Sequence, residues 1–289
     1  MATSNFKNIR LVASDLDGTL LVHSDMTAQS GGAPSPRART VIHKLADKGV
    51  RFVLASGRPP RTMDCAVEQV GLDNVLTICC NGGLVYDPFN KNIVKKYSIP
   101  NKDICSILDT IIKCLGPQVC LGAESGLHFV CDENYVKERN DFLDHHYIVR
   151  KPMEFLQTPE DTIEKLVIIL PGMPAEKLNE RLLELFSSDH WKQVVNITFS
   201  NPHSIEISAA GISKGSALED LCQELGVKAE ETIAFGDMPN DSDMLKFAGT
   251  GVAVENAHPS VKEIADRVTA SNVDDGVAIV LEEVLEQLS

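Results

Sequence analysis

The first part of the chain alternates apolar runs with stretches of helical periodicity. Three apolar runs have the length and composition of buried strands, at residues 9–14, 50–55 and 75–80. Between the first two, Val41, Ile42 and Leu45 recur at helical spacing, with Ser35 as a capping residue and Gly49 at the end. This strand–helix–strand order predicts a parallel sheet with right-handed crossovers.

Beyond residue 84 the pattern changes to pairs of strands around short turns. Two such pairs are expected, at 84–86 with 93–97 and at 119–123 with 127–130. Helices are predicted over residues 102–115, 133–144 and 175–186, and further strands at 166–170, 194–199 and 204–207. Paired strands combined with helices predict an antiparallel α+β domain.

The alternation of strand and helix resumes after Gly211. A helix is predicted over 216–225, strands over 232–235 and 251–254, and a last helix over 276–288. The predicted fold class is therefore α/β, a Rossmann-like parallel-sheet core with an inserted α+β domain. The core comprises residues 1–85 and 208–289, and the insert comprises residues 86–207.

Composition narrows the classes of partner and compartment. The formal net charge of −14 argues against nucleic acid, because phosphate backbones bind basic surfaces. No apolar run is long enough to span a bilayer, and the N-terminus lacks the apolar core of a signal peptide, so we expect no membrane association. The eight cysteines have no metal-ligand spacing, which favours reduced thiols in a cytoplasmic protein.

Two carboxylates, Asp15 and Asp17, follow the first predicted strand, and Gly18 and Thr19 come directly after them. Open α/β sheets form their sites at the carboxyl ends of strands. One carboxylate can act as a nucleophile and the other as a general acid and base, and the pair can hold Mg²⁺. A surface turn is the structural alternative, and the same residue types also occur in calcium loops.

Three further polar segments stand at strand ends or helix starts: Ser56-Gly57-Arg58, Lys214, and the run from Asp237 to Asp241. Taken singly, they indicate a turn, a solvated lysine and a helix cap. His145 and His146 have no partner at metal-ligand spacing, so a solvent-exposed loop is the better interpretation of that pair.

In their order along the chain, these segments resemble the four motifs of the haloacid dehalogenase-like hydrolase superfamily, and specifically its Cof-type phosphatases. Asn81-Gly82-Gly83 is similar to the Asn-Gly signature of that subfamily. The position of the inserted domain, between the second and third motifs, is similar to the C2B-type cap of this branch. The resemblance implies that residues 20–35 form a flap over the site.

The resemblance also implies a role for each motif residue. Asp15 would attack phosphorus and form an aspartyl-phosphate, Asp17 would serve as general acid and then base, and Lys214 would offset negative charge. Mg²⁺ would be held by Asp15, the backbone carbonyl of Asp17 and Asp237, with Asp241 orienting a metal-bound water. Asn240 would hold Lys214 or a phosphate oxygen. The residues expected to bind the substrate phosphate are Ser56, Gly57, Arg58 and Asn240.

The function implied by the resemblance is Mg²⁺-dependent hydrolysis of a small phosphorylated metabolite. Sugar phosphates lead, and phosphorylated cofactors such as pyridoxal phosphate or flavin mononucleotide are the second class. A phosphomannomutase-like phosphotransferase and a non-catalytic module that binds a phosphorylated metabolite are the alternatives. We expect a monomer or a homodimer.

Overall fold

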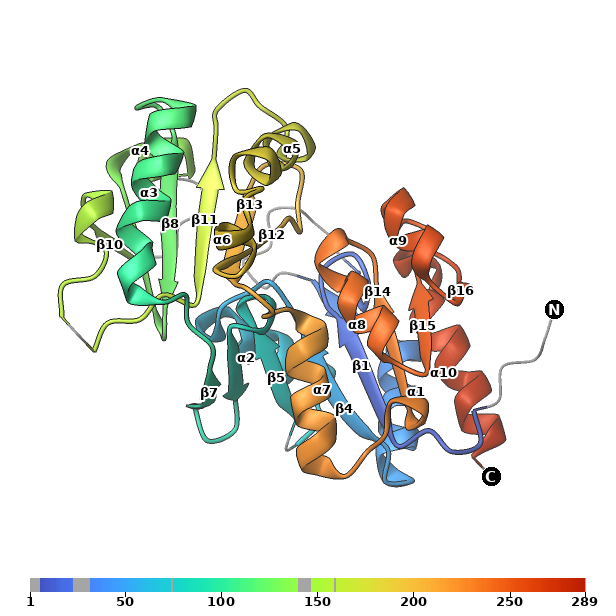
Figure 1. Cartoon of the computed structure of the whole chain (residues 1–289). Coiled ribbons are helices and arrows are strands. Elements are labelled where there is room, and N and C mark those ends of the chain that lie inside the picture. The colour runs from blue at the N-terminus through green and yellow to red at the C-terminus, as the bar shows by residue number, and fades with distance from the viewer. Residues whose placement is uncertain (1–5, 23–31, 74, 140–146, 159, 289) are drawn as a thin grey trace. The chain divides into compact units, whose positions relative to one another are not determined.

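The computed structural model describes residues 6–22, 32–73, 75–139, 147–158 and 160–288. The chain forms two compact units: a core unit of residues 1–94 and 214–289, and an inserted unit of residues 95–213 (Figure 1). The expected insert, 86–207, differs from this division at both ends. The strand pair after residue 84 lies in the sheet of the core unit, because its hydrogen bonds continue that sheet.

The sheet of the core unit has its predicted parallel centre. Its order among the described residues is β16 (Arg267–Val268), β15 (Thr250–Ala253), β14 (Thr232–Gly236), β1 (Leu11–Asp15), β4 (Arg51–Ala55), β5 (Leu76–Cys79), β6 (Leu84–Asp87) and β7 (Asn92–Lys96). Strand β1 pairs in parallel with both β4 and β14. Strand β6 pairs antiparallel with β5. The carboxyl ends of β4, β1 and β14 therefore meet at one edge.

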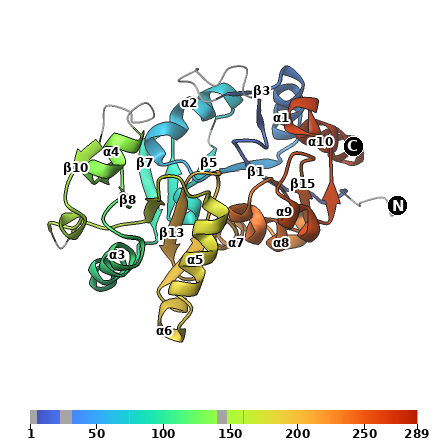
Figure 2. The ribbon, with the colours of Figure 1, turned by 90° about the horizontal axis from the view of Figure 1, so that it is seen from above.

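Helices cover both faces of this sheet. On one face lie α1 (Pro36–Asp47), α2 (Pro60–Val70) and α10 (Gly276–Gln287), and on the other lie α7 (Lys214–Leu225) and α8 (Ser242–Phe247) (Figure 2). The predicted start of α1 is confirmed, since the Ser35 hydroxyl accepts a hydrogen bond from the Ala38 N–H. Helix α8 and α9 (Pro259–Ile264) were not predicted, because six residues carry too little periodicity.

Short elements complete the core unit. Strands β2 (Leu21–Val22) and β3 (Ala33–Pro34) pair antiparallel within the segment predicted to be irregular, and residues 23–31 of that segment lie outside the described residues. Single turns of 3₁₀ helix are η1 (Cys80–Gly82), η4 (Ala229–Glu231), η5 (Pro239–Asp241) and η6 (Asn272–Asp274).

The inserted unit is the expected α+β domain. Its sheet order is β10 (Tyr147–Val149), β9 (His128–Cys131), β8 (Cys120–Ser125), β11 (Lys165–Ile169), β13 (Ile205–Ala209) and β12 (Val195–Thr198). Both predicted strands of the β8–β9 hairpin are confirmed. Strand β10 was missed, and it pairs in parallel with β9 in an otherwise antiparallel sheet.

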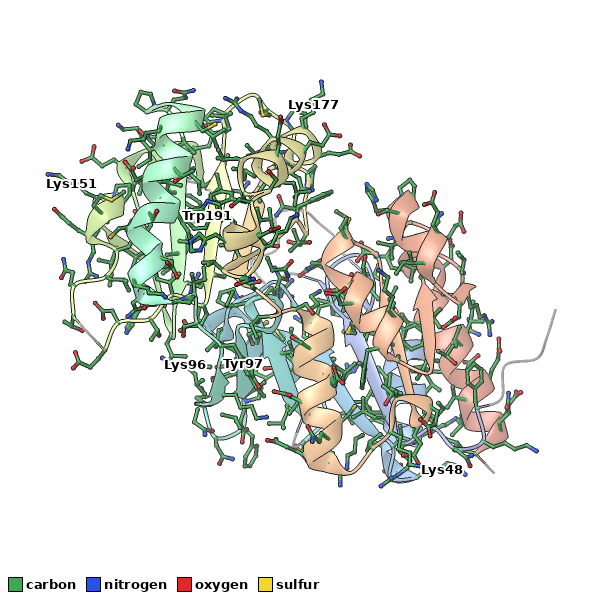
Figure 3. All side chains as sticks on the ribbon, viewed as in Figure 1. Lys48, Lys96, Tyr97, Lys151, Lys177 and Trp191 are labelled. Atoms are coloured by element: carbon green, nitrogen blue, oxygen red, sulfur yellow. The ribbon has the colours of Figure 1, made fainter. Side chains whose placement is uncertain are left out.

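The helices of the inserted unit are α3 (Asn101–Leu115), α4 (Glu133–Arg139), α5 (Ala175–Leu185) and α6 (Asp189–Lys192), with the single turn η3 (Pro152–Glu154). The predicted continuation of α4 to residue 144 and the His145-His146 pair lie outside the described residues. Trp191 packs edge-on against Phe186, with ring centroids 5.1 Å apart (Figure 3).

Among the described residues there is neither a membrane-spanning helix nor a disulfide. No helix among them is both long enough and apolar enough to cross a bilayer. None of the eight cysteines, all of which lie in the described part of the chain, forms a disulfide.

Candidate active site

Asp15 is the last residue of β1, the strand at the centre of the core sheet. The five residues of β1 are buried, and Asp15 itself is 5% exposed. Because β1 is flanked in parallel by β4 and β14, the loops that follow these three strands carry Asp17, Ser56 and Asp237 to the same edge of the sheet.

Lys214 is the first residue of α7 and is fully buried. Its ammonium Nζ lies 2.5 Å from Asp15 Oδ1 and 2.6 Å from Asp241 Oδ1. Burial alone would lower the pKa of Lys214, but the two carboxylates outweigh burial and raise it. Lys214 is therefore a permanent cation between two acids that are far apart in the sequence.

The second oxygen of Asp241 organises the loop after β14. Asp241 Oδ2 accepts hydrogen bonds from the backbone N–H groups of Asp237 (2.9 Å) and Met238 (3.0 Å). A Cβ atom at Gly236 would lie 2.5 Å from the Asp241 Cβ, so glycine is required there for the carboxylate to fold back on its own loop.

Asp237 is held by the first motif. The Thr19 hydroxyl donates to Asp237 Oδ1 at 2.9 Å. Gly18 has a φ of +81°, and a Cβ atom at Gly18 would lie 2.5 Å from Asp237 Oδ2. Gly18 thus serves both the left-handed turn and the close approach of this carboxylate. The Asn256 side chain, for which the sequence offered no signal, donates to the Gly18 carbonyl at 2.7 Å.

The site concentrates negative charge in a buried place. The pKa of Asp15 is raised well above its ordinary value by burial, with further contributions from Asp241 and Asp237, against the opposing effect of Lys214. Burial and the Asp241 charge raise the pKa of Asp237 to about 7, although the Thr19 hydrogen bond opposes this. A bound cation would stabilise the ionised form of these buried carboxyl groups.

The donor set fits a hard divalent cation. Ligand oxygens of Asp15, Asp237 and Asp241 all lie within 4.8 Å of one another. Asp15 Oδ2 is buried and has no hydrogen-bond partner. A buried carboxylate oxygen without a partner is costly, and a metal ion or a ligand removes that cost. Carboxylate oxygens are the ligands that Mg²⁺ prefers.

Asp17 stands apart from that cluster. Its side chain is 41% exposed and forms a two-point ion pair with Arg58, with Nε 2.7 Å from Oδ2 and Nη2 2.5 Å from Oδ1. Burial lowers the pKa of Arg58, but the Asp17 carboxylate outweighs burial and raises it. The sequence brought both residues to this edge, but it did not predict that they pair with each other.

Ser56 and Asn240 complete the predicted set. Ser56 is buried, and its hydroxyl accepts the Arg58 N–H at 3.1 Å. The Asn240 amide is buried and donates to Asn81 Oδ1 at 2.9 Å. Asn240 was expected to hold Lys214 or a phosphate oxygen, whereas the contact in this structure is with Asn81.

The family model of haloacid dehalogenase-like hydrolases matches residues 12–281. The chain is 31% identical over 276 residues to the 5-amino-6-(5-phospho-D-ribitylamino)uracil phosphatase YcsE of Bacillus subtilis, and the match covers 94% of each chain.

Solved structures share the fold. A haloacid dehalogenase-like hydrolase from B. subtilis matches with a TM-score of 0.79 at 23% identity, over 95% of this chain and 99% of that one. A sugar phosphatase of subclass IIB of the same superfamily matches with a TM-score of 0.75 at 21% identity, over 95% and 98%. With the buried Asp15–Lys214–Asp241 contacts and the family match over residues 12–281, this chain belongs to the haloacid dehalogenase-like hydrolases.

Proposed function

We propose that this protein is a Mg²⁺-dependent phosphatase that hydrolyses small phosphate monoesters through an aspartyl-phosphate. The observation that carries the proposal is the asymmetry of Asp15. One of its oxygens contacts the Lys214 ammonium, and the other is buried with no hydrogen-bond partner. A carboxylate held at one oxygen and without a partner at the other is arranged to act as a nucleophile.

In the first step, Asp15 Oδ2 forms a bond to phosphorus while the bond from phosphorus to the ester oxygen breaks. Asp17 gives its proton to the leaving alkoxide. In the second step, Asp17 takes a proton from a water whose oxygen attacks phosphorus. The bond between phosphorus and Asp15 then breaks, which releases phosphate and restores the carboxylate.

The proposed metal ligands are Asp15, Asp237 and the backbone carbonyl of Asp17, and Asp241 would orient a bound water. Bound Mg²⁺ would shield negative charge so that an anionic carboxylate and an anionic phosphate can approach each other. Lys214 contributes to the same end because it remains charged beside Asp15.

The proposed phosphate-binding groups are the Ser56 hydroxyl, the Gly57 N–H, the Asn240 amide and the Arg58 guanidinium. Arg58 is paired with Asp17 in this structure, so a substrate phosphate would compete with Asp17 for the guanidinium. A phosphate that draws Arg58 toward itself would free the Asp17 carboxylate to take up a proton from solvent, which it would then give to the leaving group.

We propose sugar phosphates as the leading substrate class, and pyridoxal phosphate or flavin mononucleotide as the second. A relative that is 31% identical is named for a phosphoribitylamino-pyrimidine, and this compound carries its phosphate on a sugar-alcohol chain. A structural neighbour of the same fold is named a sugar phosphatase. We further propose a cytoplasmic location, which is supported by eight cysteines without a disulfide.

The test is phosphate release from a panel of sugar phosphates, nucleotides, pyridoxal phosphate and flavin mononucleotide. Each substrate is assayed with Mg²⁺, with chelator, and with the variant Asp15→Asn. We expect release that requires Mg²⁺ and disappears in the variant. Release that needs a sugar 1,6-bisphosphate would indicate the mutase instead. Phosphate binding with no turnover on any substrate would favour the binding module.

A further inference from the structure

The turn that follows β5 has an unusual backbone. Cys80, Asn81 and Gly82 have φ angles of +52°, +56° and +97°. Left-handed backbone is unfavourable for residues with a side chain, although asparagine tolerates it better than most. Cys80 and Asn81 are both buried. A backbone conformation of this kind persists only where surrounding contacts hold it.

Backbone groups of this turn hold the loop that carries Ser56. The Asn81 N–H donates to the Ser56 carbonyl at 3.2 Å, and the Cys80 N–H donates to the Arg58 carbonyl at 2.9 Å. The Ser56 N–H donates to the Ile78 carbonyl at 2.8 Å, just before the turn. The backbone of the Ser56–Arg58 loop is thus fixed from the β5 side.

The side chain of Asn81 reaches a different loop. Asn81 Oδ1 accepts a hydrogen bond from Asn240 Nδ2 at 2.9 Å, across 159 residues of sequence. This bond uses one hydrogen of the Asn240 amide and fixes the plane of that amide. Asn240 Oδ1, an acceptor, is buried and has no hydrogen-bond partner, and the group that Asn240 can offer to a phosphate oxygen is the second hydrogen of Nδ2.

The same turn also adjoins the helix that presents the lysine. Both η1, which contains Asn81, and η5, which contains Asn240, pack against α7, and α7 begins at Lys214. The turn after β5 therefore touches the three elements that carry Ser56, Lys214 and Asn240.

We propose that Asn81 is a positioning residue that fixes the Asn240 amide relative to Ser56, so that both side chains bind one phosphate group. This inference rests on the proposed function, in which Ser56 and Asn240 bind the substrate phosphate. The serine and asparagine side chains are short, so each can bind a phosphate oxygen only if its backbone is positioned accurately. A displacement of about 1 Å at a binding group can cost about 100-fold in rate.

The competing explanation is that asparagine stands at residue 81 only because it tolerates a left-handed turn. Glycine tolerates that backbone even better, so the two explanations predict opposite results for Asn81→Gly. If Asn81 serves the turn alone, glycine preserves function. If Asn81 positions Asn240, glycine preserves the fold and impairs phosphate binding.

The first experiment measures the affinity of Asn81→Gly for inorganic phosphate by calorimetry with Mg²⁺, together with kcat/KM on the best ester. We expect phosphate affinity and kcat/KM to fall by about tenfold or more, with an unchanged Mg²⁺ requirement and a retained cooperative unfolding transition. Lys91→Gly is the matched control, because Lys91 also has a side chain at a φ of +52°, in the exposed β6–β7 turn. We expect wild-type values for this control.

The second experiment tests the pair. Asn240→Ala is made in the wild type, in Asn81→Gly and in Asn81→Asp, which keeps both the acceptor oxygen and tolerance of the left-handed turn. We expect about a tenfold loss of phosphate affinity in the wild-type and Asn81→Asp backgrounds, and less than about threefold in the Asn81→Gly background. Should Asn81→Gly not fold, Asn81→Ala takes its place as the background without an acceptor oxygen: a reduced Asn240→Ala loss there supports the proposal, and a full loss contradicts it.

Wild-type phosphate affinity in Asn81→Gly, or an equal Asn240→Ala loss in every background, would overturn the proposal. The affinity measurement also separates this inference from the proposed function. A wild type that binds phosphate but hydrolyses no ester contradicts the phosphatase, and the affinities still decide the role of Asn81. A wild type that neither binds phosphate nor turns over contradicts both.

Discussion

The two compact units bury charged groups in different ways. In the core unit, the Lys214 ammonium contacts two carboxylates, yet Asp15 keeps a buried oxygen that has no hydrogen-bond partner. In the inserted unit, the Lys165 ammonium meets the Glu206 carboxylate at 2.8 Å, and both side chains are nearly inaccessible to solvent. The first arrangement leaves a buried carboxylate oxygen without a partner, and in the second the ammonium and the carboxylate contact each other directly.

Other buried acids of the inserted unit hold backbone groups. Glu164 accepts hydrogen bonds from the Ser98 hydroxyl (2.9 Å) and the Gly126 N–H (2.6 Å). Asp132 accepts the Tyr135 N–H at 2.7 Å. These carboxylates stabilise turns and a helix start. The difference teaches that burial of charge does not by itself mark a site. A buried charge indicates chemistry where its hydrogen-bonding capacity is left unused.

The largest expected effect comes from Asp15→Asn. We expect kcat for phosphate release to fall by about 10³-fold or more, because the amide cannot form the acyl phosphate. Thermal stability should be retained, since burial and neighbouring acids already raise the pKa of the native carboxyl. Asp109→Asn, at an exposed ion pair of α3, is the control and should keep full activity. Full activity in Asp15→Asn would remove the nucleophile from the proposal.

The converse variant is Glu206→Gln. Removing the Glu206 charge takes a carboxylate away from the buried Lys165 ammonium, and we expect a loss of about 3–5 kcal/mol in the free energy of unfolding. Activity per folded molecule should be unchanged. Lys113→Gln breaks the exposed pair with Asp109 and should cost only about 0.5 kcal/mol or less in a denaturant titration.

A Glu206→Gln protein of normal stability and impaired kcat/KM would contradict a purely structural role for the buried pair. That result would place the Lys165–Glu206 pair in substrate recognition. It would also show that fully paired buried charges can carry function in this molecule.

A pH series on the metal-free protein tests the buried acids of the core unit. The pKa of Asp237 is raised to about 7 by burial and by Asp241, so the folded state binds this proton more tightly than the unfolded state. The contribution of Asp237 to the free energy of unfolding should therefore be largest below pH 4. It should decrease as pH rises toward 7, by up to about 1.4 kcal/mol per pH unit.

The measurement compares urea titrations of the wild type and Asp237→Asn from pH 4 to 8, without Mg²⁺. We expect the wild type to lose stability relative to the variant as pH rises, and added Mg²⁺ to reverse that loss above pH 7. Parallel pH profiles for the two proteins would show that Asp237 is an ordinary carboxylate.

Sequence reasoning predicted the elements whose pattern is long and the places where their ends converge. Strand β1 and helices α1 and α7 have enough buried positions in a regular pattern to be predicted from the sequence. Some short elements, among them α9, β10 and β16, were missed because their few residues show no clear period. The β6–β7 hairpin was predicted, but local pattern does not say which sheet a hairpin joins.

The site divides in the same manner. The sequence placed Asp15 and Asp237 together because parallel strands end at a common edge, and it added Lys214 through the resemblance of its motif. It did not predict that Arg58 forms an ion pair with Asp17, or that Asn240 contacts Asn81, because partner choice among neighbouring polar side chains depends on distances of a few tenths of an ångström. Asn81 carried a signal in its Asn-Gly pair, whereas Asn256 carried none.

Two buried threonines of the core unit differ in what their hydroxyl groups contact. Thr19 and Thr77 are both buried threonines, but the Thr19 hydroxyl donates to Asp237 and the Thr77 hydroxyl donates to the Tyr86 carbonyl within the sheet. Thr19→Val removes one hydrogen bond, and Thr77→Val removes the bond to Tyr86 together with a 3.4 Å contact to Cys79 Sγ; each change should cost about 1 kcal/mol of stability.

Of these two variants, only Thr19→Val should change the Mg²⁺ requirement of the enzyme. Without the Thr19 hydroxyl, Asp237 loses the hydrogen bond that orients it, and we expect the Mg²⁺ concentration for half-maximal activity to change by about threefold to tenfold. Thr77→Val should leave that concentration unchanged while showing the same shift in thermal unfolding. If both variants change the Mg²⁺ requirement equally, the effect is a general loosening of the core, and the Thr19–Asp237 contact has no particular part in metal binding.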